Sequence, residues 1–174
     1  MLKKIVGIII LLALTAGAYV LYSNPKVKDA VLELVDKKSS TQTKTEAKNI
    51  VKDKEALITL AETNMQSFAL ALKKKDMTAF YNDLSDYWQQ RTSVEKLNKV
   101  FEPLMKSGFD LTVLKNMHPS IGRGIKITKE DHLAIPGNYC VKDALILFEQ
   151  TYLFEGTKGW KLVGFTLDIK GKEK

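Results

Sequence analysis

The side chains that could perform acid–base chemistry are few and widely spaced along the chain. Such a reaction needs an ionisable base and a proton donor that converge on one pocket. The candidate bases and tyrosine donors are Asp83, Asp86, His118, Tyr81, Tyr139 and Tyr152. They form no recognisable catalytic set, and Asp83 and Asp86 are explained more simply as carboxylates at helix ends. We therefore predict no catalytic residue and favour a non-catalytic protein.

The histidines and the cysteine form no metal-binding pattern. His118 stands before a proline in an expected loop and His132 lies in an expected turn, so both are predicted at the surface. Zinc sites need clustered cysteine and histidine ligands. The chain has one cysteine, Cys140, which cannot form an intramolecular disulfide. We predict no metal and no cofactor.

Positive charge is spread along the chain rather than gathered in one patch. The formal net charge is +7, and Lys73, Lys74 and Lys75 form the one lysine run in the expected domain. Cations at the C-terminal end of a helix interact favourably with its dipole, which is sufficient reason for that run. Nucleic-acid binding would need a basic stripe with interleaved aromatic residues, so we predict no nucleic-acid partner.

The start of the chain has the composition of a membrane-targeting segment. Two lysines precede residues 5–22, which are uncharged and mostly apolar. As a helix this stretch would be roughly 27 Å long, close to the hydrocarbon thickness of a bilayer. It contains the cleavage motif Ala16-Gly17-Ala18. Residues 1–22 are therefore either a retained signal anchor, which we favour, or a cleaved signal peptide.

The charge pattern around this segment predicts the location of the rest. Lysines that precede a transmembrane segment stay on the cytoplasmic side, so everything after the segment is expected across the membrane. We predict a polar linker over residues 23–55, a folded domain over 56–170 and a basic tail over 171–174. The protein is then a single-pass protein of the inner (cytoplasmic) membrane with its domain in the periplasm or outside, or a secreted protein if the signal is cleaved.

The first half of the domain has the periodicity of helices. Apolar residues recur every three to four positions from Leu57 to Leu72 and predict a helix of about five turns. Asp76 is expected to cap a short second helix. Thr92 and Glu95 form a capping-box pattern for a third helix, which should stop at Gly108.

The second half has the alternation of strands. We predict a strand over residues 109–113, a brief one at Ile125 and Ile127, and a turn at Pro136-Gly137-Asn138. Two long strands, residues 144–154 and 160–170, should form a hairpin. Helices followed by antiparallel strands define an α+β fold.

This succession resembles the nuclear-transport-factor-2-like superfamily, also called cystatin-like, in which three helices pack on a curved antiparallel sheet to form a cone. The residues that carry the resemblance are Phe68 and Leu72 in the first helix, the hinge ending at Asp76, the aromatic second helix, and the final hairpin. The hairpin pattern Y-x-x-E-x₃-G-W-K-L-x-G, residues 152–164, is similar to that of small exported or lipid-anchored members of unassigned function. The resemblance covers residues 56–170.

The superfamily hosts several activities. Its members include enzymes such as ketosteroid isomerase and scytalone dehydratase, non-catalytic ligand or dimerisation modules, and membrane-anchored scaffold subunits of type IV secretion systems. The resemblance to the isomerase would place a base on a strand. In the predicted strand 109–113, however, Asp110 alternates away from the apolar side chains and meets solvent, so the chain departs from the enzymes at this point.

The cone implied by the resemblance would enclose aromatic side chains. Those that could line a pocket for a small apolar ligand are Phe68, Tyr81, Trp88, Phe101, Phe148, Tyr152 and Trp160. They could equally fill the interior, which we favour because aromatic residues bury the most surface.

One strand is apolar on both faces. In strand 144–154, Ile146 and Phe148 share one face and Leu145 and Leu147 the other. The second face needs a cover, and a homodimer or an envelope protein would supply it. We therefore predict a membrane-tethered extracytoplasmic binding or assembly module that dimerises or docks through its sheet. The alternative is a pocket protein, or an isomerase- or dehydratase-like enzyme, that acts on a small apolar ligand.

Overall fold

The structure is a computed structural model that describes residues 45–46 and 49–171. The predicted signal anchor, the linker up to residue 44 and residues 172–174 of the predicted tail lie outside the described residues. Within the described part, no helix has the length and apolar character needed to cross a membrane. In chain order the elements are α2 (Lys54–Lys74), α3 (Thr78–Asn82), α4 (Asp86–Gln89), α5 (Val94–Lys106), η2 (Leu111–Asn116), β1 (Ser120–Ile121), β2 (Lys126–Ile127), β3 (Leu133–Cys140), β4 (Ala144–Phe154), η3 (Gly156–Lys158) and β5 (Trp160–Gly171).

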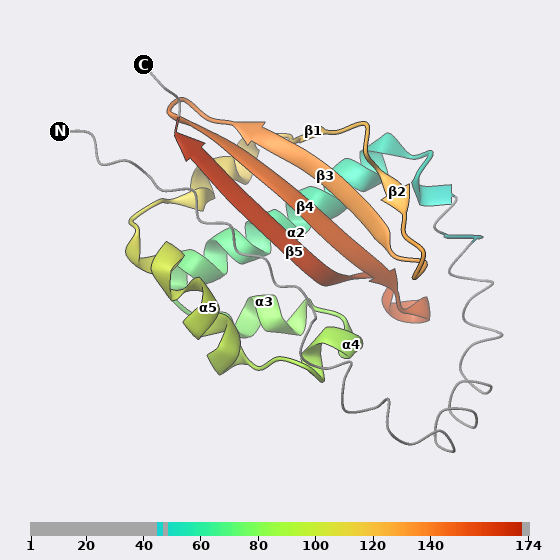
Figure 1. The fold of residues 1–174 in the computed structure, drawn as a ribbon, viewed down its shortest axis with the longest axis horizontal. Coiled ribbons are helices and arrows are strands. Elements are labelled where there is room, and N and C mark those ends of the chain that lie inside the picture. Colours follow the sequence, from blue (N-terminus) through green and yellow to red (C-terminus); the bar gives the residue numbers. More distant parts are fainter. Residues whose placement is uncertain (1–44, 47–48, 172–174) are drawn as a thin grey trace.

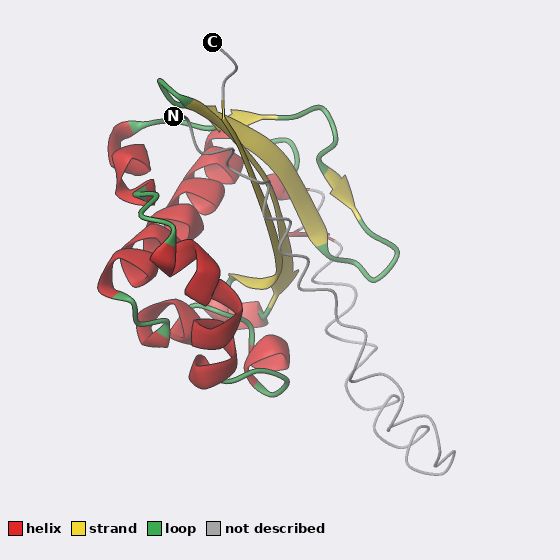
Figure 2. Ribbon diagram, turned by 60° about the vertical axis from the view of Figure 1, so that its left-hand side comes forward, coloured by secondary structure: helices red, strands yellow, loops and turns green. Residues whose placement is uncertain are grey.

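The described chain forms two layers. A five-stranded antiparallel sheet has the order β1-β3-β4-β5, and β2 also pairs with β3. The helices gather on one side of this curved sheet, and α2 crosses it behind β4 and β5 (Figure 1, Figure 2). No described helix covers the other side (Figure 2). The predicted α+β class is confirmed.

Helix α2 forms where the apolar periodicity predicts it. Asp53 caps its start, because its side chain accepts a hydrogen bond from the Ala56 amide at 3.0 Å. The helix ends at Lys75, whose backbone takes the left-handed conformation with φ +56° and whose N–H donates to the Ala71 and Leu72 carbonyls. The lysine run thus lies at the C-terminal end of the helix, as expected.

The predicted second helix corresponds to α3, and α4 follows it as a separate short helix that was not predicted. Met77, not Asp76, is the N-cap of α3, so the predicted cap is off by one residue. The Asp76 side chain lies just before it and accepts hydrogen bonds from the Thr78 amide (2.9 Å) and hydroxyl (2.6 Å). A separate α4 begins after Ser85, whose hydroxyl accepts from the Trp88 amide at 3.1 Å. Asp83 caps the end of α3 and Asp86 is the first residue of α4. Both carboxylates lie at helix ends, as expected.

Helix α5 begins one residue later than predicted. Ser93, not Thr92, is its N-cap and accepts a hydrogen bond from the Lys96 amide at 3.3 Å. Glu95 then falls in the first turn and hydrogen-bonds to Ser93, which lowers the pKa of the Glu95 carboxyl. The helix ends just before Gly108, which has φ +75°. That stop agrees with the prediction.

The strand predicted over residues 109–113 is wrong, because this segment leads into the 3₁₀ helix η2. The Asp110 carboxylate accepts hydrogen bonds from the Thr112 amide (2.8 Å) and hydroxyl (2.6 Å), which caps a helical turn. Leu111 and Leu114, three residues apart, are both buried, as the three-residue period of a 3₁₀ helix requires. Val113 points to solvent instead.

The turn predicted at Pro136-Gly137-Asn138 is also wrong, because β3 runs through it without a break. On its outer edge β3 pairs with β1 and with β2 but not between them. Pro136 lies at this interruption, where its missing N–H removes no ladder hydrogen bond. Gly137 is needed for a different reason: a Cβ there would lie 2.5 Å from Cζ of Phe148 on β4.

The predicted terminal hairpin is confirmed. Strand β4 has the predicted bounds and β5 begins at the predicted residue, and the two pair along their whole length with a bulge opposite Thr151 and Tyr152. Glycines at 156 and 159 adopt positive φ in the connecting turn, a conformation that glycine reaches without strain. The brief strand predicted at Ile125 and Ile127 corresponds to β2, whereas β1 was not predicted.

Aromatic rings form the centre of the core between the two layers. Phe68 of α2 lies 4.8 Å from Phe101 of α5, 5.2 Å from Phe80 of α3 and 4.8 Å from Phe165 of β5, measured between ring centroids. All four rings are buried. One side chain therefore joins three helices to the last strand.

Candidate functional site

The seven aromatic residues predicted to line a pocket do not share one wall. Phe68 and Phe101 contact each other in the core, and Phe148 packs against Tyr139 at 5.6 Å. Trp88 and Tyr152 are buried as well. Tyr81 and Trp160 are only partly buried and lie further out: Tyr81 donates to the Gln89 carbonyl, and Trp160 packs on Phe154. The two cavities described below are lined by other residues.

A buried polar cluster sits between α2 and the sheet. The Tyr152 hydroxyl lies 2.6 Å from Oε1 of Gln150 and 3.2 Å from the Leu60 carbonyl. Gln150 donates to the Ala61 carbonyl at 3.3 Å, and Asn64 donates to the Leu60 carbonyl at 3.1 Å. These polar groups satisfy one another and the backbone of α2. Sequence reasoning missed Gln150, although Gln150 shares the inward face of β4 with Phe148 and Tyr152.

The buried tyrosines stay protonated. Burial raises the pKa of Tyr152, and burial together with the nearby Glu62 carboxylate raises the pKa of Tyr139. A phenol with a raised pKa is a poor base at neutral pH. Neither group is poised to accept a proton from a substrate.

The candidate bases lie away from this cluster and from one another. Asp83 accepts a hydrogen bond from the Ser67 hydroxyl at 2.6 Å, and Asp86 pairs with Lys158 at 2.5 Å, which raises the pKa of that lysine. His118 is 83% exposed and its Nδ1 lies 2.6 Å from a Glu62 carboxylate oxygen. His132 is partly buried, and burial lowers its pKa. Among the described residues, no three His, Cys, Asp or Glu side chains gather as a metal site would require.

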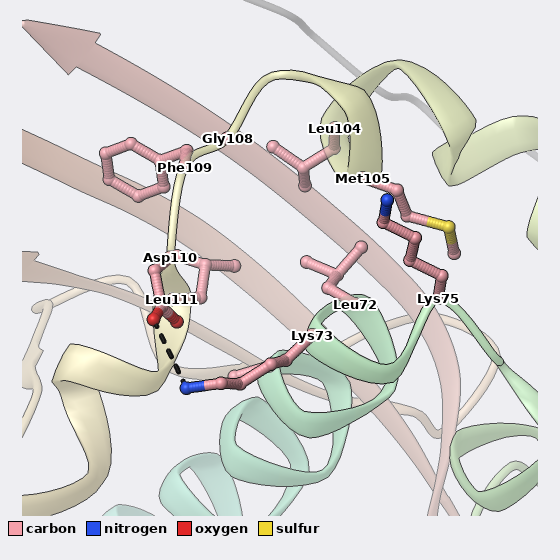
Figure 3. Close-up of a pocket in the computed structure, with 10 residues that line it drawn as sticks. Leu72, Lys73, Lys75, Leu104, Met105, Gly108, Phe109, Asp110 and Leu111 are labelled. Atoms are coloured by element: carbon pink, nitrogen blue, oxygen red, sulfur yellow. Dashed lines mark hydrogen bonds and ion pairs between the residues drawn. The ribbon is translucent and has the colours of Figure 1, made fainter.

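The structure instead places a cleft where the C-terminal ends of α2 and α5 meet the start of η2 (Figure 3). Its volume is about 200 Å³. The lining residues are Ala69, Leu72, Lys73, Lys75, Leu104, Met105, Gly108, Phe109, Asp110 and Leu111. Leu72, Leu104 and Leu111 are buried beneath it, so the floor is apolar and the charged groups stand at the rim.

The rim of this cleft has one carboxylate and two ammonium groups. Lys73 Nζ lies 3.4 Å from Oδ2 of Asp110 and 3.3 Å from the Thr112 hydroxyl. The hydrogen bonds from Thr112, followed by the charge of Lys73, lower the pKa of Asp110, so this carboxylate is ionised at neutral pH. Figure 3 shows Lys75 reaching up beside Met105, and no ion pair joins it to another described residue. The rim therefore has a net charge of +1.

A second, smaller cavity adjoins the cleft. It has a volume of about 120 Å³ and shares Ala69 and Leu111 with the cleft. Leu70 and Lys115 also line it, and Leu70 is 52% exposed. Sequence reasoning missed both cavities because it placed residues 109–113 in a strand. The three-residue spacing of Leu111 and Leu114 behind Asp110 could have revealed the helical turn that forms them.

The outer face of the sheet is the other notable surface. Leu145 and Leu147 of β4 point to this face and are partly exposed, as predicted, and Leu153 lies on the same face beyond Glu149 and Thr151. In the register of the sheet, Lys170 lies beside Leu145, and Asp168 beside Leu147. Glu149 follows Leu147 two residues along β4. Lys170 Nζ lies 3.5 Å from a carboxylate oxygen of Asp168.

Comparisons with protein-family models, curated proteins and solved structures found no match to this chain.

Proposed function

We propose that this protein is a membrane-tethered extracytoplasmic binding module, without catalytic activity, that assembles with a second copy of itself through the outer face of its sheet. The single observation that carries the proposal is the pair of neighbouring leucines, Leu145 and Leu147, on a face that no described helix covers. A sheet with one packed face normally presents polar side chains on the other. Apolar side chains there are typical of an interaction site.

The interior of the domain supports a non-catalytic function. Gln150 and Tyr152 hydrogen-bond to each other and to α2, so their polar atoms are occupied by the fold. The candidate bases Asp83 and Asp86 are engaged with Ser67 and Lys158 at the surface. An acid–base site needs a base and a donor within reach of one substrate atom, and the described residues do not supply such a pair.

The charges on the outer face favour a second copy as the occupant. Lys170 lies in register with Leu145, whereas Glu149 lies two residues beyond Leu147 in the other direction. The two charges thus flank Leu147 from opposite sides. A second protomer packed face to face with its strands reversed about Leu147 brings Glu149 of each copy over Leu145 of the other, next to Lys170, which already pairs with Asp168 of its own strand. Two-fold symmetry makes this approach twice.

Cross-linking through Cys140 tests the dimer in the full-length chain. Cys140 is exposed, is the single cysteine of the chain, and lies in register with Leu145 at the edge of this face. A bis-maleimide added to membranes that contain the protein should yield a covalent dimer. Leu147→Glu should abolish that product. The matched control is Leu70→Glu, because Leu70 is an exposed leucine on the helical side.

A charge exchange tests the arrangement of the two copies. Glu149→Lys and Lys170→Glu should each reduce the cross-linked product, and the double variant should restore it. If the wild-type chain gives no cross-linked dimer, or if Leu147→Glu and Leu70→Glu behave alike, the dimer proposal is wrong.

We further propose that residues 1–22 hold the domain at the outer side of the inner membrane, and that the domain belongs to the nuclear-transport-factor-2-like cones. The lysines before residues 5–22 and the apolar run itself support the first point. The order of helices before a curved antiparallel sheet supports the second. Protease added to intact spheroplasts should digest the domain, and protection of the domain from the protease would refute the topology. An experimental structure whose sheet does not curve around the helices would refute the family assignment.

A further inference from the structure

We infer that the cleft between the C-terminal ends of α2 and α5 is a binding site for a small aliphatic carboxylate, with the alkyl chain on the leucine floor and the carboxylate at Lys75. This inference does not rest on the dimer or on the membrane location. It rests on the shape, the charge and the volume of one cavity.

The floor of the cleft selects an apolar chain. Leu72, Leu104 and Leu111 close it from below, and Met105 and Phe109 stand at its sides. These side chains come from two helices and a 3₁₀ turn, which hold the cavity open between them. An alkyl group placed there removes apolar surface of both ligand and protein from water, which is the main source of affinity for such ligands.

The rim selects a single negative charge. Lys73 is already paired with Asp110, whose other oxygen is held by Thr112. Lys75 has no ion pair with any other described residue, so one cation is left for a ligand. Both helices point the negative ends of their dipoles toward this region, which opposes an anion, so the ammonium group of Lys75 must provide the attraction.

The backbone at Lys75 has a conformation that is unusual for its residue type. Its φ of +56° lies in the left-handed region, where glycine is the usual residue at the end of a helix. A non-glycine residue there costs roughly 1–2 kcal/mol. A residue held at such a cost is a reason to look for a use of its side chain, and this side chain stands at the cleft.

The volume of the cleft limits the length of the ligand's alkyl chain. A cavity of about 200 Å³ has room for about seven groups the size of a water molecule. That matches a carboxylic acid of about six to eight carbons with its carboxylate at the rim. An extended peptide would need a longer groove, so a small monocarboxylate fits better.

The test titrates butyrate, hexanoate, octanoate and decanoate, below their micellar concentrations, into the full-length chain in lipid nanodiscs. Methyl-labelled methionine supplies the readout, because Met105 lines the cleft whereas Met65 and Met77 are fully buried in the core. The Met105 signal should move and the core signals should not. Affinity should rise roughly fourfold per methylene up to hexanoate or octanoate and then stop rising.

Variants separate the site from a general effect of the acid. Lys75→Met should weaken hexanoate binding roughly two- to fivefold, the range for an exposed ion pair, and should leave hexanol binding unchanged. The matched control is Lys74→Met, because Lys74 lies in the same lysine run but does not line the cleft. Ala69→Leu should fill the cavity and block every acid, while unmoved Met65 and Met77 signals show that the core is intact.

Three results would overturn the inference. The Met105 signal could stay in place with all four acids, and the only role of Lys75 would then be to end α2. Lys74→Met and Lys75→Met could weaken binding equally, which would indicate general attraction to positive charge. Affinity could be independent of chain length, or could appear with an acidic peptide and not with the acids, which would exclude a cavity-sized alkyl ligand.

Discussion

The buried pair of Tyr152 and Gln150 gives the sharpest test of whether the interior is structural. The Tyr152 side chain is fully buried, and its hydroxyl lies 2.6 Å from Oε1 of Gln150. Tyr152→Phe removes that donor and leaves the buried amide oxygen unsatisfied. An unsatisfied buried polar group costs about 1–3 kcal/mol, so we expect the free energy of unfolding to fall by about 2 kcal/mol.

The same change should cost little when the partner is also removed. In a Gln150→Leu background the Tyr152 hydroxyl can donate to the Leu60 carbonyl, which already lies 3.2 Å away. Replacing both partners by apolar groups of similar shape is close to neutral. We therefore expect a coupling free energy of roughly 1–2 kcal/mol between the two positions.

Urea unfolding of the four chains in a mild detergent measures this coupling. The fluorescence of Trp88, which is buried against the core, should report the transition. A loss of 2 kcal/mol corresponds to a midpoint shift of roughly 1 M for a domain of this size. If Tyr152→Phe leaves the midpoint unchanged, the hydroxyl is not part of the fold and is free to contact a ligand. That result would refute the structural role and revive the enzymatic alternative.

Three further predictions follow from single contacts. Gly137→Ala should lower the free energy of unfolding by about 1–3 kcal/mol, because its Cβ would meet the Phe148 ring, and Phe148→Leu should recover part of the loss in thermal unfolding. The lowered pKa of Asp110 gives stability that is present above its usual pKa of 3.8 and is lost as the pH falls through the lower folded value; Asp110→Asn should therefore flatten the acid side of the stability curve, and an unchanged acid side would contradict this. The raised pKa of Tyr139 has the opposite effect on the pH dependence: it gives stability that is present below pH 10.0 and is lost as the pH rises above that value. Tyr139→Phe should therefore unfold less readily in alkali than the wild type, as followed by circular dichroism.

Local patterns in the sequence predicted most of the elements. The helix over residues 54–74 and the terminal hairpin follow directly from apolar periods of 3.6 and 2. The N-cap of α5 was harder to predict, because Thr92 and Ser93 are both good N-caps. Only the packing of α5 decides between them. The separate α4 was not predicted, because the second helix was expected from its apolar residues between Met77 and Leu84, and Ser85 was not identified as another N-cap.

Two failures came from residues whose environment is set by distant partners. Pro136-Gly137 has the composition of a turn, and only the gap between β1 and β2 and the Phe148 ring explain why it lies in a strand. Residues 109–113 alternate like a strand, but the carboxylate of Asp110 caps a helical turn. The cleft depends on that turn, so no pattern within one segment could have predicted the cavity. The outward leucines, by contrast, required only the two-residue period of a strand.

The position of Phe165 has a consequence for how the chain reaches its folded state. Its ring contacts Phe68, which lies far earlier in the sequence, and it belongs to β5, which follows all the other strands of this sheet in the chain. The apolar faces of α2 and α5 therefore stay exposed until β5 has been synthesised. Contacts between residues so far apart in the sequence slow folding. Until they form, apolar surface stays exposed and can drive aggregation. A chain cut short before β5 should be captured by chaperones or degraded rather than accumulate as a smaller folded unit.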